Sequence, residues 1–372
     1  MLNSPIPDPS TLPALVPEEL AARAAAAVRE ILAEGAAANT TRSYASALRY
    51  WAGWHRLRYG QPIALPVPEA AVVQFIVDHL ARRGDDGGRV WELPAAADAQ
   101  LQAAGLKQKP GPFKHSTVVH RVAVLSKAHQ LRKAANPCEA PAVRHLLARG
   151  RRAAVKRGER PRKKTAITRT ELEAMLATCD GSLVGVRDRA LLCFAFASGG
   201  RRRSEVAAAD VADLRRLGPE AYVFHLGASK TDQDGTNANA DKPLLGTAAV
   251  ALTAWLEASG IKNGALFRRL WGERVGPALS GAAVAGIVQR RARAAGLTGD
   301  FAGHSLRSGF VTEGGRQGVA LPALMAMTDH RAVASVIGYF QSGSADQNPA
   351  ARLLMPQRPD GSSTPGEETY SR

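Results

Sequence analysis

The apolar positions of the first 160 residues recur at the spacing of α-helices. Five helices are predicted there, at residues 18–35, 41–60, 68–84, 116–134 and 141–158. The second is the clearest, because Tyr44, Ala47, Leu48 and Trp51 follow the i, i+3, i+4, i+7 rule for one face of a helix. The Asn-Thr pair that precedes it can cap its first turn. This part of the chain is therefore predicted to be an all-α unit.

The second half of the chain has a mixed pattern. Thr168 or Thr170 is expected to cap a helix, and residues 186–200 are apolar on most faces, which is typical of a buried helix. Residues 221–246 contain short runs of β-forming residues around a polar turn, which predict a hairpin or a three-stranded sheet. After this segment the pattern is helical almost to the end. The predicted fold class is mainly α with a small antiparallel β-sheet, with an all-α domain preceding an α+β domain.

Breaks in the periodicity set the expected domain boundaries. Gly84–Gly88 interrupts the first unit, and the charged, aperiodic segment around Pro161 is the expected linker. The Pro-rich start is expected to be an irregular arm, and the polar end a disordered tail. The predicted division is an arm at 1–18, an α-helical domain at 19–157, a basic linker at 158–168, a second domain at 169–356 and a tail at 357–372.

Basic residues are concentrated in one short part of the chain. The 372 residues include 49 Lys and Arg against 33 Asp and Glu, a net charge of +16. Residues 101–165 hold 17 basic and 2 acidic side chains, whereas residues 1–100 carry a net charge of −2 and residues 166–372 one of +3. This concentration favours binding to a polyanion, because each cation placed on a phosphate releases counterions. A solvated basic helix and linker is the plainer interpretation.

Several classes of protein are not indicated by the sequence. No apolar run approaches the ~18–20 residues that cross a bilayer. The N-terminus lacks the basic and apolar regions of a signal peptide. Cys138, Cys179 and Cys193 lie far apart and lack C-x-x-C spacing, which excludes a disulfide framework and a cysteine-based zinc site. We therefore expect a soluble cytoplasmic protein.

Two motifs in the second half contain an arginine at a spacing that suits one shared site. In GGRRRSEV, the spacing R-x-S-E selects Arg202 and places Glu205 on the same helical face. In GHSLRSG, His304 and Arg307 lie three residues apart, so one helical turn directs both side chains toward one place. Each motif also has a plainer explanation. For the first motif, it is that one arginine of the run forms a structural ion pair with Glu205 or Asp210. For the second, it is that the histidine and the arginine lie on a solvated helix face.

A lysine, a histidine and a tyrosine complete the candidate set. Lys230 lies at the end of a predicted strand, where the chain enters the polar turn of ASKTDQDG. Pro322 marks the start of a helix that is interrupted at Asp329 and His330, and Tyr339 follows on a second short helix. Taken singly, a lysine at a hairpin tip is usually solvated, and a tyrosine at such a position usually belongs to the core.

The order of these motifs carries more weight than any one of them. R-x-S-E, S-K-T, H-x-x-R and H-x8-Y follow one another between residues 202 and 339. With this order the chain resembles the tyrosine recombinase (phage integrase) family, over residues 165–356 and more loosely over residues 20–157. The resemblance implies a core-binding domain that forms a C-shaped clamp around DNA with the catalytic domain. No additional arm-binding domain is expected.

The resemblance also implies the chemistry. The family cleaves DNA through a 3′-phosphotyrosyl intermediate with a free 5′-hydroxyl, and it requires neither ATP, a metal nor another cofactor. The catalytic residues that it implies in this chain are Arg202, Glu205, Lys230, His304, Arg307, His330 and Tyr339. We find no carboxylate cluster in the sequence that would bind Mg²⁺. The two arginines are expected to clamp the phosphate oxygens in the place of a metal ion.

Each remaining side chain of this set has an expected role. His304 is the candidate acceptor of the tyrosine proton, with Glu205 supporting the local geometry. His330 is expected to donate a hydrogen bond to the phosphate. Lys230 is the candidate acid that protonates the leaving 5′ oxygen, and Lys242 is the next candidate for that role.

Double-stranded DNA with inverted-repeat sites is the expected partner. The candidate DNA-binding residues are Arg42, Lys127, Arg151, Arg152, Lys156, Arg157, Lys163 and Lys164. The resemblance implies a monomer in solution that forms a homotetramer on DNA. Asn348–Met355 of one protomer is expected to dock on its neighbour, although this segment could instead pack on its own domain. The expected location is the cytoplasm, in association with the nucleoid, in a bacterial or phage context.

One residue departs from the family pattern. The family usually has Gly immediately before the second histidine, whereas this chain has Asp329. A carboxylate there is expected to raise the pKa of His330 or to reorient its ring.

The sequence leaves several questions open. The alternatives are a type IB topoisomerase-like enzyme that relaxes DNA, a catalytically inert DNA-binding regulator, and a basic helical module without enzymatic activity. The target DNA, the need for an accessory DNA-bending factor, and the biological role are also open. That role could be prophage integration, mobile-element transfer or chromosome resolution.

Overall fold

The structure is a computed structural model that describes residues 38–160, 164–227, 239–330 and 332–339. The chain divides into two compact units, Met1–Pro161 and Arg162–Arg372. The division falls inside the predicted linker. In the described part of the chain, no helix is both long and apolar enough to cross a membrane. Each unit is described below by itself.

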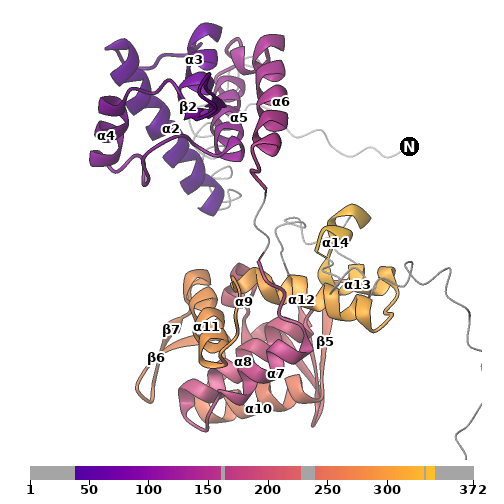
Figure 1. The fold of residues 1–372 in the computed structure, drawn as a ribbon. Helices are drawn as coiled ribbons and strands as arrows, with labels where there is room; N and C mark the ends of the chain where they lie inside the picture. Colours follow the sequence, from indigo (N-terminus) through magenta and orange to yellow (C-terminus); the bar gives the residue numbers. More distant parts are fainter. Residues whose placement is uncertain (1–37, 161–163, 228–238, 331, 340–372) are drawn as a thin grey trace, which may run out of the picture. The chain divides into compact units, whose positions relative to one another are not determined.

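The first unit is a group of helices with one short hairpin (Figure 1). Its elements are α2 (Ala38–Tyr59), α3 (Glu69–His79), β1 (Arg82–Arg83), β2 (Arg89–Val90), α4 (Ala95–Ala103), α5 (His115–Leu131) and α6 (Pro141–Lys156). The predicted helices at 41–60, 68–84, 116–134 and 141–158 are confirmed, whereas the one at 18–35 lies outside the described residues. Helix α4 was not predicted.

Two boundaries in the first unit differ from the prediction. Helix α2 includes Asn39 and Thr40, so these residues are helical and do not act as caps before it. Helix α3 ends at His79 and not near Gly84, because the chain turns there into the two short strands β1 and β2. The Gly-Asp-rich break forms the tip of that hairpin, where Gly87 has a positive φ of 79°.

Aromatic side chains form the core of the first unit. Trp51 stacks on Phe75 with ring centroids 3.7 Å apart, and Trp54 meets the same ring edge-on at 5.0 Å. The indole nitrogen of Trp54 donates to the buried carboxylate of Asp78 at 2.8 Å. Residues 51, 54 and 75 are fully buried, so the helical periodicity of α2 and α3 sets which side chains meet in this core.

A neutral histidine is buried beside this core. His79 is 0% exposed. Its Nδ1 lies 2.7 Å from the carbonyl oxygen of Phe75, which can only accept, so Nδ1 carries the proton. The hydroxyl of Tyr50 therefore donates to Nε2 at 2.6 Å. Burial lowers the pKa of His79 to about 3, so the ring is neutral at pH 7.

This histidine predicts a loss of stability in acid. Because the unfolded state takes up a proton near the usual pKa of 6.5 and the folded state does not, stability falls as the pH drops from 6.5 toward 3. Between pH 7 and pH 5 His79 is expected to contribute about 2 kcal/mol of this loss. The measurement is denaturant unfolding of wild type and His79→Gln at both pH values. An equal pH dependence in the two proteins would contradict the assignment.

The second unit surrounds the buried helix α8 (Figure 1). Its helices are α7 (Arg169–Ala177), α8 (Leu183–Ala197), α9 (Arg203–Ala208), α10 (Thr247–Ser259), α11 (Gly281–Ala294), α12 (Gly303–Arg316), α13 (Leu321–Thr328) and α14 (Val333–Tyr339). Thr168 caps α7, and Glu171 bonds back to its backbone nitrogen at 2.8 Å. Phe194 of α8 packs edge-on against Phe224 and Phe267, as expected for a helix that is apolar on most faces.

The predicted sheet is three-stranded and antiparallel. Its strands β3 (Leu214–Gly218), β4 (Ala221–His225) and β5 (Asp241–Leu245) lie in the order β3-β4-β5. Lys242 pairs with Phe224 in the β4–β5 register, and both side chains are buried on the same face of the sheet. Since successive residues of a strand alternate between faces, the strand pattern places a lysine in the interior of this unit.

A second hairpin shows that the expectation of helix throughout the residues after 246 was wrong. Strands β6 (Arg268–Trp271) and β7 (Arg274–Ala278) pair antiparallel. Gly272, with a positive φ of 63°, allows the tight turn between them. The hairpin is largely exposed, and Trp271 packs over Gly276. Its few apolar residues therefore do not show the clear alternation by which a half-buried strand is predicted.

The chain enters the second unit along α12. The backbone nitrogen of Ile167 donates to the carbonyl oxygen of Ser305 at 2.9 Å, and that of Thr165 donates to Asp300 at 3.1 Å. A Cβ at Gly309 would lie 1.7 Å from the carbonyl oxygen of Ile167, so only glycine permits this approach. The end of the predicted linker is thus fixed to the helix that carries two of the candidate catalytic residues.

Candidate active site

Two glycines bring the candidate arginines together. Gly199 and Gly200 follow α8, with φ of 98° and 66°, conformations that other residues rarely adopt. A Cβ at Gly200 would lie 2.4 Å from the Cα of Arg307, and one at Gly199 would lie 2.0 Å from the carbonyl oxygen of Met327. The Gly-Gly pair therefore lets the segment before α9 pack directly against α12 and the end of α13.

Arg202 and Glu205 form the contact that their spacing predicted. Arg202 is the N-cap of α9, and its Nη1 donates to Glu205 Oε1 at 2.6 Å. The backbone nitrogen of Arg202 also donates to Glu205 Oε2, at 3.1 Å. The carboxylate is buried, whereas the Arg202 side chain is partly exposed, at 19%. The glutamate thus anchors one edge of a guanidinium that still reaches the surface.

Arg307 is fixed from the opposite direction. It lies in α12 and is 0% exposed. Its Nη2 donates to the carbonyl oxygen of Thr328 and lies 3.2 Å from Nε2 of His330, while Nη1 donates to Gly200 at 3.4 Å. Because an arginine can only donate, Nε2 of His330 must accept. His330 is thereby oriented by the guanidinium.

The other nitrogen of His330 completes a short chain of hydrogen bonds. Nδ1 donates to the Thr328 hydroxyl at 2.7 Å, and that hydroxyl donates to the carbonyl oxygen of Leu324 at 2.6 Å. Burial and the nearby arginines lower the pKa of His330 to about 4. The carboxylate of Asp329 acts to raise this pKa, as the sequence predicted, but desolvation and Arg307 outweigh it, so the net change is a decrease.

His304 lies near the same arginines. It is in the first turn of α12, one turn before Arg307, and it is exposed. Desolvation, Arg307 and Arg202 together lower the pKa of His304. The charges of both arginines lower this pKa, which requires that they lie close to the ring. The structure therefore brings His304, Arg202 and Arg307 together from two segments about 100 residues apart.

Asp329 makes a different set of contacts from the one expected. Its Oδ2 accepts from Arg201 Nη1 at 2.6 Å, and its Oδ1 accepts from Lys242 Nζ at 2.7 Å. All three side chains are buried. Arg201 also lies 3.8 Å from Glu205, so two arginines of the run approach that carboxylate. Asp210 instead caps the turn that follows, through the backbone nitrogen of Ala212.

Lys242 is excluded as the second candidate for the general acid. Its side chain is 0% exposed, and its Nζ donates to Asp329 and to the carbonyl oxygens of Asn239 and Ala326. An ammonium has three protons, and all three are used. It is not placed to protonate a group on DNA.

Three of the predicted residues lie wholly or partly outside the described part of the chain. Lys230 and Lys163 lie outside the described residues. Tyr339 is the last described residue of α14, a helix that packs against α12, and its side chain is outside what the structure describes. The hydroxyl of Tyr222, by contrast, is buried and bonded to Thr253 Oγ1 at 3.0 Å. The docking segment Asn348–Met355 also lies outside the described residues.

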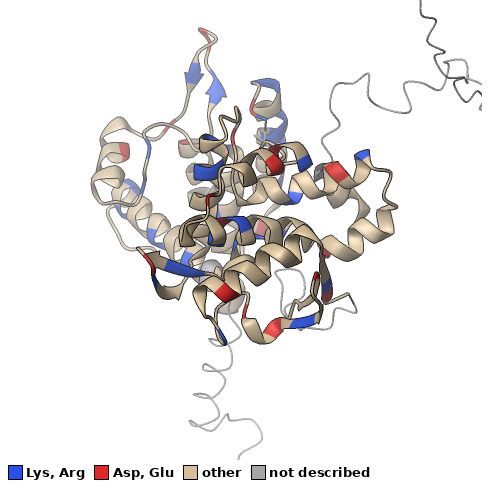
Figure 2. Ribbon diagram, turned by 90° about the horizontal axis from the view of Figure 1, so that it is seen from below, with Lys and Arg blue, Asp and Glu red and all other residues tan. Residues whose placement is uncertain are grey.

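The predicted DNA-binding residues of the first unit lie on three helices. Arg42 in α2, Lys127 in α5, and Arg151, Arg152 and Lys156 in α6 are exposed. Arg157 follows α6 and bonds Glu159 at 3.4 Å. Lys164 belongs to the second unit and forms an ion pair with Asp300 at 2.5 Å. Figure 2 shows lysines and arginines on many separate parts of the described chain.

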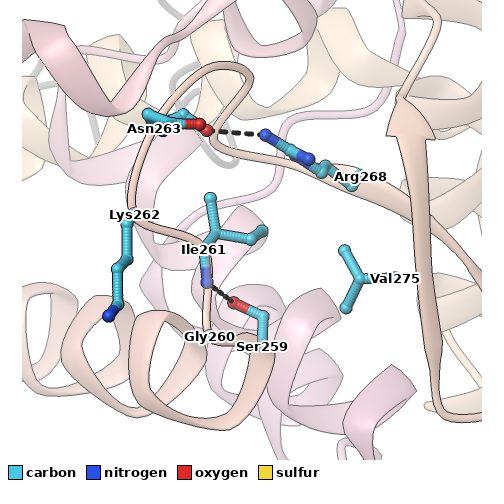
Figure 3. A pocket seen from close by; sticks show the side chains of 7 residues that line it. All are labelled: Ser259, Gly260, Ile261, Lys262, Asn263, Arg268 and Val275. Carbon is cyan, nitrogen blue, oxygen red and sulfur yellow. Dashed lines mark hydrogen bonds between the residues drawn. The ribbon is translucent and has the colours of Figure 1, made fainter.

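A surface pocket lies away from these residues. It is found between the end of α10 and the β6–β7 hairpin, lined by Ser259, Ile261, Lys262, Arg268 and Val275 (Figure 3). Arg268 is held there by the carbonyl oxygen of Asn263 at 2.6 Å. The pocket contains none of the candidate catalytic side chains. Among the described residues, no group of three or more His, Cys, Asp or Glu side chains could hold a metal ion.

Comparison with known proteins identifies the family. A family model described as the phage integrase family matches residues 165–345. An integrase/recombinase xerD homolog of Selenomonas ruminantium is 30% identical over 268 residues, which cover 68% of this chain and 76% of that protein. The chain belongs to the phage integrase family of tyrosine site-specific recombinases. It is therefore an enzyme of site-specific DNA recombination, which cleaves and rejoins DNA.

Further relatives agree with this assignment. The recombinase Cre of Escherichia phage P1 is 26% identical over 272 residues, covering 68% of this chain and 76% of that protein. The integrase of transposon Tn1549, solved with transposon right end DNA, matches with a TM-score of 0.50 at 13% identity, over 87% of this chain and 96% of that one. At this identity the structural similarity supports the fold, a mainly helical one with small antiparallel sheets.

Proposed function

We propose that this recombinase cleaves DNA by attack of Tyr339 on a phosphate held by Arg202 and Arg307. The attack forms a 3′-phosphotyrosyl bond and releases a 5′-hydroxyl. The observation that carries the proposal is the convergence of Arg202, His304, Arg307 and His330 at the start of α12. These side chains come from three separate segments of the chain.

The two guanidiniums supply the positive charge of the reaction. Phosphoryl transfer depends mainly on positioning and charge stabilisation. Arg202 and Arg307 are held by Glu205 and by backbone carbonyls, so their orientation is set before DNA binds. Preorganised donors of this kind stabilise the developing charge on the non-bridging oxygens at no cost of reorganisation.

The two histidines are suited to different tasks. His304 is exposed and has a lowered pKa, so at neutral pH it is unprotonated and able to accept the proton of the attacking tyrosine. His330 accepts a hydrogen bond from Arg307, so the ring and the guanidinium hold each other in place. The expected donation from His330 to the phosphate requires a proton on Nε2. The bound anion would favour that proton, because a nearby negative charge raises a histidine pKa.

Lys230 remains the proposed acid for the leaving 5′ oxygen, and this proposal has a selective test. An alkoxide leaves poorly without a proton, whereas a thiolate leaves readily because a thiol has a pKa of about 8.5. Lys230→Ala should therefore be very slow on ordinary DNA and recover most of its cleavage rate on DNA with sulfur at the 5′-bridging position.

Arg307→Ala is the control for this test. It should show no selective recovery on the sulfur-containing DNA, because Arg307 acts on the non-bridging oxygens. Rescue of both variants, or of neither, would show that Lys230 is a phosphate contact and not the acid.

The proposed partner is double-stranded DNA with inverted-repeat sites, bound through the exposed cations of the first unit. Arg151, Arg152 and Lys156 lie on α6, the helix with the highest density of such cations. Phosphate contacts of this kind position a protein on the duplex without reading its sequence.

Assembly into a tetramer on DNA is also proposed. Attack by a 5′-hydroxyl of a second duplex gives recombination, whereas return of the original 5′-hydroxyl gives only relaxation. Membership of the site-specific recombinase family supports the first outcome. Docking of Asn348–Met355 on a neighbouring protomer is the proposed contact between subunits, and a DNA-bending factor is a proposed accessory to this assembly.

A further inference from the structure

Three buried cations bind consecutive carbonyl groups at the end of α13. Lys242 Nζ donates to the carbonyl oxygen of Ala326 at 2.7 Å, Arg201 Nη2 to that of Met327, and Arg307 Nη2 to that of Thr328. The last carbonyls of a helix have no partner within the helix, and its C-terminal end favours positive charge. The cations come from β5, from the Gly-Gly segment and from α12, so this helix end joins three parts of the unit.

Asp329 makes this concentration of charge possible. It follows the last of these carbonyls in the left-handed conformation, with φ of 54° and ψ of 38°, a region that Asp tolerates better than most residues. From there its carboxylate reaches both Arg201 and Lys242. Two buried cations without an anion would be strongly unfavourable. A glycine at this position would permit the backbone conformation but would not neutralise them.

The same helix end orients the proposed catalytic groups. Thr328, immediately before Asp329, accepts from Arg307 through its carbonyl and from His330 through its hydroxyl. His330, immediately after Asp329, accepts from Arg307. The position of the 328–330 backbone therefore sets where the Arg307 guanidinium and the His330 ring lie.

We propose that Asp329, held between Arg201 and Lys242, is a positioning residue of this recombinase that fixes Arg307 and His330 for catalysis. The inference rests on the proposed function of Arg307. Asp329 does not touch the DNA phosphate in this arrangement, because Arg201 and Lys242 occupy its oxygens. It acts through the backbone of its two neighbours.

The test is the cleavage rate of Asp329→Asn on two substrates. Asn keeps the shape and the tolerance for a left-handed conformation but removes the charge. A displacement of Arg307 by about 1 Å is expected to slow single-turnover cleavage of ordinary DNA by about 100-fold. On DNA with a neutral methylphosphonate at the cleavage point, one negative charge is gone and the placement of Arg307 matters less. The defect there should shrink to less than about tenfold.

Asp188→Asn is the matched control. Asp188 is another buried carboxylate of the second unit that bridges two cations, Arg187 at 2.6 Å and Arg291 at 2.9 Å. Neither of these two arginines is among the proposed catalytic residues. Asp188→Asn should lose stability but cleave both substrates at nearly the wild-type rate per folded molecule. If the proposed function is wrong, wild type and Asp188→Asn will themselves fail to cleave ordinary DNA. A failure of the inference appears only in the substrate ratio of Asp329→Asn.

Arg201→Met is a second variant that tests the same proposal if Asp329→Asn does not fold. It removes one cation but leaves Asp329 paired with Lys242, so no unpaired carboxylate remains. The same selective defect is expected. If Asp329→Asn and Arg201→Met cleave as fast as Asp188→Asn per folded molecule, or are equally slow on both substrates, Asp329 has only a structural role and the proposal is overturned.

Discussion

Tyr339→Phe should abolish the covalent protein–DNA adduct and leave DNA binding unchanged. The substitution removes the proposed attacking oxygen alone, because the ring and the cations proposed to contact the phosphate are kept. The measurement uses a nicked suicide substrate, from which the short cleaved fragment diffuses away so that the adduct accumulates. Denaturing electrophoresis then detects the adduct, and a filter or gel-shift assay measures binding.

Tyr222→Phe is the matched control for this prediction. Its hydroxyl is buried and bonded to Thr253, so this variant should form the adduct at a rate close to wild type. Adduct formation by Tyr339→Phe would show that another tyrosine attacks. Because Tyr222 is buried, Tyr370 would then be the first to test.

Arg307→Ala should slow cleavage by about 10³-fold with a much smaller effect on DNA binding. The guanidinium is preorganised by Gly200, Thr328 and His330, and its charge is needed most in the transition state. Single-turnover cleavage at saturating enzyme separates this rate from affinity. Arg307→Lys should recover only a small part of the activity, because an ammonium cannot present two parallel donors.

Arg187→Ala provides the comparison for a buried arginine that is not among the proposed catalytic residues. Arg187 is similarly buried and pairs with Asp188 in α8. Its loss should lower stability without changing the cleavage rate per folded molecule. If Arg187→Ala and Arg307→Ala were slowed equally, the effect of Arg307 would be on folding and not on the transition state.

Local sequence patterns were sufficient for much of the fold and for part of the site. Helix α2 was predictable because its apolar residues keep one face over several turns. The pairing of Arg202 with Glu205 followed from a spacing of three residues. Signals of this kind lie within one element, so they can be interpreted without knowledge of the rest of the chain.

Contacts between distant segments were not predictable in the same way. Arg201 and Lys242 meet Asp329 across 128 and 87 residues, and neither pairing leaves a local pattern. The departure from glycine at position 329 was the one available signal, and it led to an expected effect on His330 but not to the contacts with Arg201 and Lys242. The charge of His330 depends on burial and on two arginines from other elements, which is why its pKa is lowered and not raised.

The most direct test of the account is to identify the residue that is joined to DNA. The adduct trapped on a suicide substrate is digested with trypsin and nuclease, and the modified peptide is identified by mass spectrometry. Cleavage after Arg331 and Arg352 gives peptide 332–352, in which Tyr339 is the one tyrosine. The account predicts a nucleotide joined through its 3′-phosphate to this peptide. A nucleotide on any other peptide, or one joined through a 5′-phosphate, would contradict it.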